Sequence, residues 1–218
     1  SEWNTAFADL ADEEDEQATE SDIKNLTPEE EELLGKYVKA LEEASGMIDP
    51  KYGKVLDLLR TWKWLDKGCI IFSQYFDTAH WVADSLAKEF PEEPIGLYAG
   101  GDKSGIFLNG SFAKKEKEIL KQMVKRREIR VLVGTDSASE GLNLQTLGTL
   151  INLDLPWNPT RLEQRKGRIQ RIGQVNDVVH VYNLRYKDSV EDRVHHLLSE
   201  RFKNIHEMFG QLPDVLED

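Results

Sequence analysis

The apolar residues of this chain follow two different periods, and these periods predict its secondary structure. Short apolar runs predict strands at residues 69–74, 94–100, 129–135, 149–155 and 178–184. Apolar residues three and four positions apart predict helices at 27–44, 49–68, 76–90, 111–127 and 189–209, and a short helix beginning in GRIQRIGQ at 167–174. Strands alternate with helices, so we expect an α/β fold with a parallel sheet covered by helices.

Polar loops follow four of the predicted strands. They read SQYFD, AGGDKSG, GTDSASEGLNLQ and LPWNPTR, and all are rich in small or hydrogen-bonding residues. Ligands of open parallel sheets bind outside the carboxyl ends of the strands. These loops are therefore the expected positions of functional residues.

Charge divides the chain into a mildly basic body and two acidic ends. Residues 1–50 contain 16 acidic and 3 basic residues, and residues 207–218 add four acidic residues and no basic ones. Residues 51–206 have a net charge of +5, which is compatible with an anionic ligand on the body. We expect a flexible acidic segment at 1–22, a helical linker at 23–50, a domain at 51–205 and an acidic tail at 206–218.

The composition also limits the compartment and the chemistry. No apolar run is long enough to span a membrane, and no signal peptide begins the sequence. The single cysteine, Cys69, lies in an apolar run, which predicts a buried thiol, excludes a disulfide framework and fits a cytoplasmic protein. His195, His196 and His206 do not have the spacing of a metal site, so no metal ligands are expected.

The sequence QRKGRIQRIGQ, at 164–174, gathers cations in an otherwise acidic chain. On a helix, Gln164, Arg168 and Arg171 would share one face, and Gly167 would let another backbone approach it. Two converging guanidiniums suit a phosphate group. A solvated basic helix face is the alternative interpretation.

This stretch resembles motif VI of superfamily 2 helicase-like ATPases, in the form found in SWI/SNF-type proteins. GCIIFSQYFDT is similar to motif IV, and VLVGTDSASEGLNLQ is similar to motif V, with Thr135, Gly141, Asn143 and Leu144 matching. LDLPWNPTRLEQRKGRIQRIGQ matches the run into motif VI, and VYNL with SVEDRV resembles the family's strand and helix after that motif. The resemblance covers about residues 51–205 and implies the C-terminal RecA-like lobe of a two-lobe motor.

The resemblance also implies roles for individual residues. Arg168 and Arg171 would be arginine fingers, reaching ATP that is held with Mg²⁺ by the N-terminal lobe. Other residues would contact ATP, namely Gln164, Gly167, Glu140 and Gly141. A third set would contact a nucleic-acid backbone, namely Ser73, Gln74, Thr135, Asp136 and Ser137. Trp157 would either stack on a base or, as we favour, line the core or the cleft.

Two departures from the family pattern qualify these expectations. The loop before Phe112 is longer than in the family, where an arginine usually follows soon after it, and it has only Lys103, so the resemblance does not imply nucleic-acid contacts from this loop. The motif V form SASEGLNLQ looks like that of distant bacterial members, such as the RNA-polymerase-associated ATPase, and suggests a bacterial, nucleoid-associated protein. The lysines of 114–125 are interspersed with Glu116 and Glu118 and are best explained as a solvated helix face.

The sequence lacks the elements that hold the nucleotide itself. It has no phosphate-binding GxxxxGK[ST] loop and no Asp-Glu pair after an apolar strand. We therefore expect a piece of a longer protein, inactive alone, monomeric or weakly self-associating, and paired in the full-length protein with an N-terminal lobe and duplex DNA. The alternatives are an RNA helicase lobe of the same superfamily and a non-catalytic binding or regulatory module.

Overall fold

The chain divides into two compact units, Ser1–Asp49 and Pro50–Asp218, and the computed structural model describes residues 27–43, 46–136, 144–156, 158–193 and 195–197. In the first unit, helix α3 (Pro28–Glu43) begins as predicted. The Thr27 hydroxyl accepts a hydrogen bond from the Glu30 N–H at 3.3 Å, and the Glu30 carboxylate accepts one from the Thr27 N–H at 2.7 Å. This reciprocal pair satisfies two N–H groups at the helix start.

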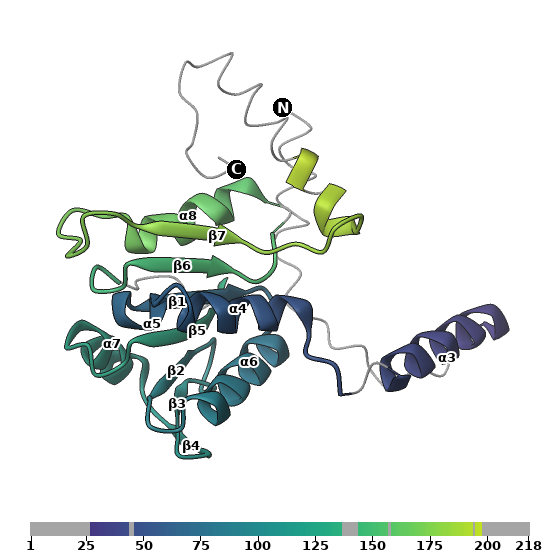
Figure 1. The fold of residues 1–218 in the computed structure, drawn as a ribbon, viewed down its shortest axis with the longest axis horizontal. Helices are drawn as coiled ribbons and strands as arrows, with labels where there is room; N and C mark the ends of the chain where they lie inside the picture. The colour runs from purple at the N-terminus through teal and green to yellow at the C-terminus, as the bar shows by residue number, and fades with distance from the viewer. Residues whose placement is uncertain (1–26, 44–45, 137–143, 157, 194, 198–218) are drawn as a thin grey trace, which may run out of the picture. The chain divides into compact units, whose positions relative to one another are not determined.

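A seven-stranded sheet forms the centre of the second unit (Figure 1). The strands run in the order β4-β3-β2-β5-β1-β6-β7. Their bounds are β1 (Cys69–Ser73), β2 (Ile95–Tyr98), β3 (Gly105–Leu108), β4 (Ser111–Lys114), β5 (Val131–Thr135), β6 (Thr149–Asn152) and β7 (His180–Asn183). The neighbours β2, β5, β1, β6 and β7 pair in parallel, which confirms the predicted α/β fold with a parallel sheet.

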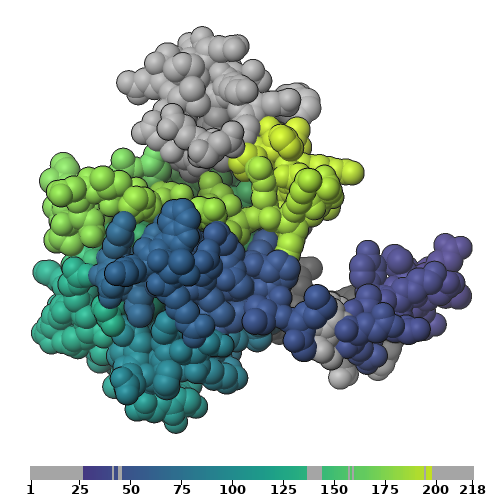
Figure 2. Space-filling view, in the orientation of Figure 1, coloured from purple at the N-terminus to yellow at the C-terminus, as the bar shows by residue number. Residues whose placement is uncertain are grey.

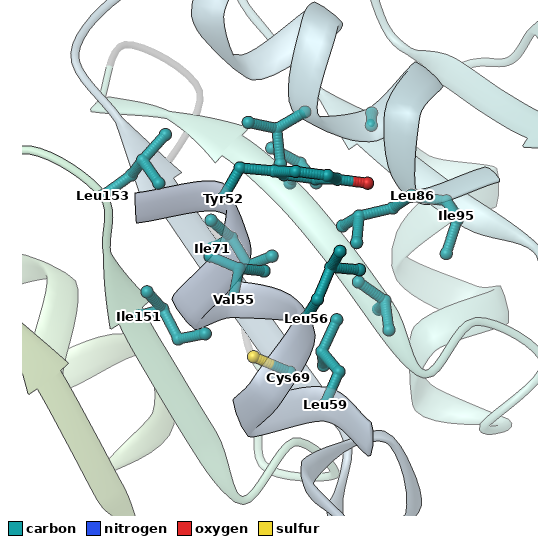
Figure 3. Close-up of a cluster of buried hydrophobic side chains, with 14 of the residues drawn as sticks. Tyr52, Val55, Leu56, Leu59, Cys69, Ile71, Leu86, Ile95, Ile151 and Leu153 are labelled. Carbon is teal, nitrogen blue, oxygen red and sulfur yellow. The ribbon is translucent and has the colours of Figure 1, made fainter. Parts of the chain in front are cut away.

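Helices cover both faces of this sheet. Helices α4 (Pro50–Arg60), α5 (Trp64–Lys67) and α6 (Phe76–Glu89) pack on one face, and α7 (Lys117–Lys125) and α8 (Pro159–Ile169) pack on the other. In β1 alternate residues serve the two cores, Cys69 and Ile71 on the α4 side and Ile70 and Phe72 on the α8 side. Figure 3 shows the α4 side chains over Ile71 and Cys69, and Figure 2 shows α4 and α6 covering this face.

The thiol of Cys69 is fully buried, as predicted, and burial raises its pKa to about 12. None of the helices within the described residues is both long and apolar enough to cross a membrane.

The single helix predicted at 49–68 is wrong, because the chain breaks it after Arg60. Lys63 adopts a left-handed conformation, with φ of 56°, and α5 begins at the next residue. The break brings Trp64 into the core, where its ring stacks on His180 at 5.9 Å and meets Tyr182 edge-on at 6.1 Å. Burial of this large side chain outweighs continuation of the helix.

A hairpin replaces the loop and helix start that we expected between residues 99 and 116. Strands β3 and β4 pair in antiparallel register, and β3 pairs with β2, so the hairpin extends one edge of the sheet. Its two-residue turn, Asn109-Gly110, has positive φ at both positions, 50° and 72°. Asn-Gly is the turn sequence that favours such hairpins, and hydrophobic periodicity does not detect it. The helix predicted at 111–127 accordingly begins only at Lys117.

The helix predicted at 189–209 lies mostly outside the described residues. Of its described residues, 190–193 and 195–197 are helical, and Ser189 lies in a bend.

Candidate functional site at the carboxyl edge of the sheet and helix α8

Three adjacent strands end at the same edge of the sheet, and a polar residue lies at or just after the end of each. Ser73 ends β1, Asp136 follows β5, and Asp154 lies two residues after β6. The order β5-β1-β6 places these residues side by side, as the parallel sheet predicts.

Asp154 is the acceptor that holds the end of β1. The Ser73 hydroxyl donates to its carboxylate at 2.6 Å, and the Gln74 backbone N–H donates to it at 2.9 Å. The Gln74 side-chain amide donates to the Leu155 carbonyl at 3.2 Å. Ser73 is fully buried and Thr135 is nearly so, whereas Gln74 is half-buried. The predicted nucleic-acid contacts of these residues stay predictions. In the structure, the polar groups of Ser73 and Gln74 bind Asp154 and the Leu155 carbonyl at this edge.

Arg165 of α8 joins the ends of β5 and β6. Its Nε and Nη2 donate to the two carboxylate oxygens of Asp136 at 2.6 and 2.7 Å. Its Nη1 donates to the Asn152 side chain and to the Asp154 carbonyl, both at 3.0 Å. Nη2 also lies 3.5 Å from the Asp154 carboxylate. Arg165 is fully buried, so these two carboxylates compensate a charge that would otherwise be costly to desolvate.

Asp136 and Asp154 share the fully buried guanidinium of Arg165, and the pKa of Asp154 is raised in this environment. Burial raises the pKa of the Asp154 carboxyl above its ordinary value, and the charge of Asp136 raises it further. Arg165 and the hydrogen bonds from Ser73 and Gln74 act in the opposite direction without cancelling the effect of burial.

Helix α8 presents one face to the core and another away from it. The helix begins at Pro159, after Asn158, whose side-chain oxygen accepts the Thr160 N–H at 2.9 Å. Its buried side chains recur at helical spacing, namely Leu162, Arg165 and Ile169. Gln164 and Gly167 are exposed, and a methyl group added at Gly167 would meet no atom within 4 Å.

Arg168, on the last turn of α8, has an incomplete set of partners. Its side chain is half-buried, and its Nε is shielded from solvent with no hydrogen-bond partner in the described part of the chain. Its backbone carbonyl accepts the Leu144 N–H at 3.2 Å. A buried, unpaired guanidinium donor is expensive, so an acceptor delivered to this face would be favoured.

Arg171 does not lie on the same helix as Gln164 and Arg168, which corrects the predicted common face. The helix ends at Ile169. The Gln174 side chain donates to the carbonyls of Ile169 at 2.7 Å and Leu147 at 3.0 Å, and Gly173 turns the chain with φ of 91°. The short helix predicted to begin at 167 is therefore the end of α8.

The exposed Arg171 instead borders a hollow of about 590 Å³ beside α8 and β7, whose lining includes Lys166, Asn176 and Val181.

Some predicted site residues lie outside the described residues, namely Ser137, Glu140, Gly141 and Trp157. Within the described residues, no three His, Cys, Asp or Glu side chains are grouped so as to hold a metal ion.

Arg165 and Asp154 organise the site, although neither is among the site residues predicted from the sequence. A signal existed for Arg165. It lies at the same helical spacing as Leu162 and Ile169, and an arginine on an apolar stripe requires buried acidic partners.

Comparisons with known proteins agree with this architecture. The family model described as helicase conserved C-terminal domain matches residues 50–173. An uncharacterized ATP-dependent helicase of Bacillus subtilis, YqhH, is 37% identical over 163 residues, which are 75% of this chain and 26% of that protein. The RNA polymerase-associated protein RapA of Vibrio campbellii is 37% identical over 161 residues, 73% of this chain and 15% of that protein. The chain thus spans about a quarter or less of these bacterial relatives.

Two solved structures share the fold. The C-terminal part of the Fun30 ATPase domain has a TM-score of 0.53 at 18% identity, covering 86% of this chain and 59% of that one. The Hef helicase domain of Pyrococcus furiosus has a TM-score of 0.54 at 21% identity, covering 77% and 32%. With the family match over more than half of the sequence, these findings show that the chain belongs to the helicase conserved C-terminal domain family.

Proposed function

We propose that this chain is the C-terminal motor lobe of a SWI/SNF-type, ATP-dependent DNA translocase. An N-terminal RecA-like lobe of the same protein holds ATP and Mg²⁺, and this lobe closes on it. Family membership and the ATP-dependent helicases among the relatives support an ATP-driven motor. The resemblance of motif VI to SWI/SNF-type proteins supports the finer assignment, and a cytoplasmic, nucleoid-associated location accords with it.

The orphaned Nε of Arg168 is the observation on which the proposal mainly rests. It lies on the same helix as the exposed Gln164 and Gly167, and among the described residues no atom lies within 4 Å of a methyl group added at Gly167. A triphosphate presented by another lobe supplies the oxygen acceptor that Arg168 lacks, and the exposed Arg171 can supply a second cation. Such arginines stabilise the charge that develops on a transferring phosphoryl group. In our proposal Gln164 and Gly167 contact ATP from this face, and Glu140 and Gly141 contact ATP as well.

The carboxyl edge of the sheet is the proposed nucleic-acid track. Gln74 is half-buried and the adjacent Tyr75 is exposed, so this edge offers an amide and a phenolic hydroxyl to a nucleic-acid backbone. This edge is formed by the ends of β1 and β5, where Ser73, Thr135 and Asp136 lie, and Ser137 follows Asp136 in the sequence. The net charge of +5 on residues 51–206 favours a polyanion.

The test is the ATPase activity of the full-length protein and of this chain alone, with and without duplex DNA. We expect DNA-stimulated hydrolysis in the full-length protein and none in the isolated chain. Arg171→Ala should lower the stimulated kcat by about 10³-fold, because an arginine finger acts in the transition state. Arg126→Ala, which changes another exposed arginine at the end of α7, is the control and should keep the rate.

The same assay decides between the alternatives. Stimulation by duplex RNA and not by DNA would make the protein an RNA helicase. A full-length protein without ATPase activity under any nucleic acid would be a binding or regulatory module. An unchanged rate in Arg171→Ala would remove Arg171 from the catalytic residues.

A further inference from the structure

Helix α8 holds both ends of the segment that connects β5 to the turn before β6. At one end the Arg165 guanidinium binds Asp136, the residue after β5, through two hydrogen bonds. At the other end the Arg168 carbonyl accepts the Leu144 N–H. The two contacts come from successive turns of one helix, so a shift of α8 moves both ends of the segment together.

The same guanidinium reaches the neighbouring strands. Its contact with the Asp154 carbonyl, at 3.0 Å, fixes the residue that accepts hydrogen bonds from Ser73 and from the Gln74 N–H. One buried side chain thus connects α8 to the ends of β5, β6 and, through Asp154, β1. These three ends form the edge described above.

We propose that Arg165 is a positioning residue that couples the carboxyl edge of the sheet to the face of α8 that includes Gln164 and Arg168. This inference rests on the proposed function, in which the edge contacts nucleic acid and the α8 face contacts ATP. Nucleic acid that displaces Gln74 or Asp136 moves Arg165, and α8 then carries Arg168 toward or away from the nucleotide. Arg165 itself touches neither ligand.

An arginine suits this role because its donors have a fixed, planar arrangement. Arg165 uses Nε, Nη1 and Nη2 on acceptors from β5 and β6, and its guanidinium lies 5.4 Å from the centre of the Phe72 ring. A lysine retains the charge but has one compact ammonium group, which cannot span these acceptors. Because the side chain is fully buried, breaking any of these contacts is costly, and the strand ends should move as a unit.

The test compares Arg165→Lys with Arg130→Lys in the full-length protein. Arg130 lies at the opposite end of β5, just before the strand, and its Nε and Nη2 donate hydrogen bonds to the Glu93 carboxylate. Both variants replace an arginine that binds one carboxylate through Nε and Nη2. Arg165 belongs to the contacts that join α8 to the strand ends, and Arg130 does not. The measurements are the ATPase kcat and KM with and without duplex DNA, DNA affinity, and Tm.

For Arg165→Lys we expect the ratio of DNA-stimulated to basal kcat to fall about five- to thirtyfold, with little change in KM for ATP. Arg130→Lys should lower Tm by less, because the Arg130 side chain is 34% exposed and that of Arg165 only 1%, and it should keep the ratio. A ratio within twofold of wild type in Arg165→Lys overturns the inference, as does an equal loss in both variants, which would indicate a structural role alone. Absence of DNA stimulation in the wild type would instead contradict the proposed function.

If Arg165→Lys does not fold, hydrogen exchange in the wild-type protein decides the question. The Gln74 N–H, which donates to Asp154, and the Leu144 N–H, which donates to Arg168, report on the two ends of the network. A non-hydrolysable ATP analogue should change the protection of both amides. A change at Leu144 with none at Gln74 would refute coupling through Arg165.

Discussion

Asp154 illustrates how a single residue can make this site sensitive to pH. Its carboxylate is almost completely buried beside Arg165, which also neutralises Asp136. Burial raises the pKa of Asp154 in the folded chain above the value of about 3.9 that an unfolded aspartate has. Between these two pKa values the folded chain binds more protons than the unfolded chain. The free energy of unfolding therefore decreases as pH rises through this window.

We predict that Asp154→Asn removes this dependence. The amide is neutral at every pH, so the stability difference between wild type and variant should shift in favour of the variant as pH rises from about 4 toward neutrality. Urea unfolding of both proteins at a series of pH values measures this difference. A difference that stays constant between about pH 4 and 8 would show that the Asp154 carboxyl titrates normally.

Ser73→Ala provides an independent check on the same carboxyl. The Ser73 hydroxyl donates to Asp154 and lowers its pKa, so the variant should extend the decrease in stability to higher pH.

The sequence could not have revealed this residue network, although it contains the residues. Arg165 and Asp136 are 29 positions apart, and Ser73 and Asp154 are 81 apart. Their contacts depend on β5, β1 and β6 being adjacent, which the order of strands along the chain does not specify. The periodicity of α8 gave a hint for Arg165, whereas the Asp154 position after β6 was visible only as one of several polar residues.

At the scale of elements, the predicted strands at 69–74, 94–100, 129–135, 149–155 and 178–184 all correspond to observed strands, each shorter than the apolar run. The runs were informative because β1, β2, β5 and β6 are buried on both faces, and β7 is half-buried along its length. The β3–β4 hairpin meets this criterion in one strand only. Strand β3 is a short apolar run that is buried except for Leu108, so it carried a strand signal that was not used. Every residue of β4 is exposed, so that strand could be found only from the turn residues before it.

The hairpin turn yields a prediction of its own. Gly110 has φ of 72°, a conformation that costs a residue with a Cβ about 1–2 kcal/mol. Gly110→Ala should therefore lower the free energy of unfolding by about 1 kcal/mol. Ser111→Ala, the next residue and exposed on β4, is the control and should change it by less than about 0.5 kcal/mol. Equal stability of the two variants would indicate that the turn tolerates another conformation.

The end of α8 shows a different reason for error. Periodicity favoured a helix through Arg171, because Gln164, Arg168 and Arg171 have helical spacing. The Gln174 side chain instead caps the carbonyl of Ile169 and links it to Leu147. Gln174 thus satisfies a carbonyl at the helix end and joins it to a residue far away in the sequence, and Arg171 lies beside the hollow near β7.

At the scale of the whole molecule, charge is the property that sequence alone describes completely. The net charge of −13 on residues 1–50 opposes the +5 on residues 51–206. If the body binds duplex DNA, the acidic segment repels the same ligand, whatever its conformation. This repulsion should weaken as salt screens it, over a Debye length of about 10 Å at 0.1 M.

We therefore predict that deleting residues 1–26, which contain nine acidic residues and one lysine, increases the affinity of the chain for duplex DNA at low ionic strength. The gain should be several-fold at about 0.05 M salt and should disappear by about 0.5 M, as expected for a screened interaction. Fluorescence anisotropy with a labelled duplex measures both affinities across the salt series. The control replaces residues 1–26 by a scrambled sequence of identical composition. If the scrambled chain binds DNA with wild-type affinity, charge is responsible. If it binds DNA as tightly as the deletion variant does, the order of these residues creates a specific contact.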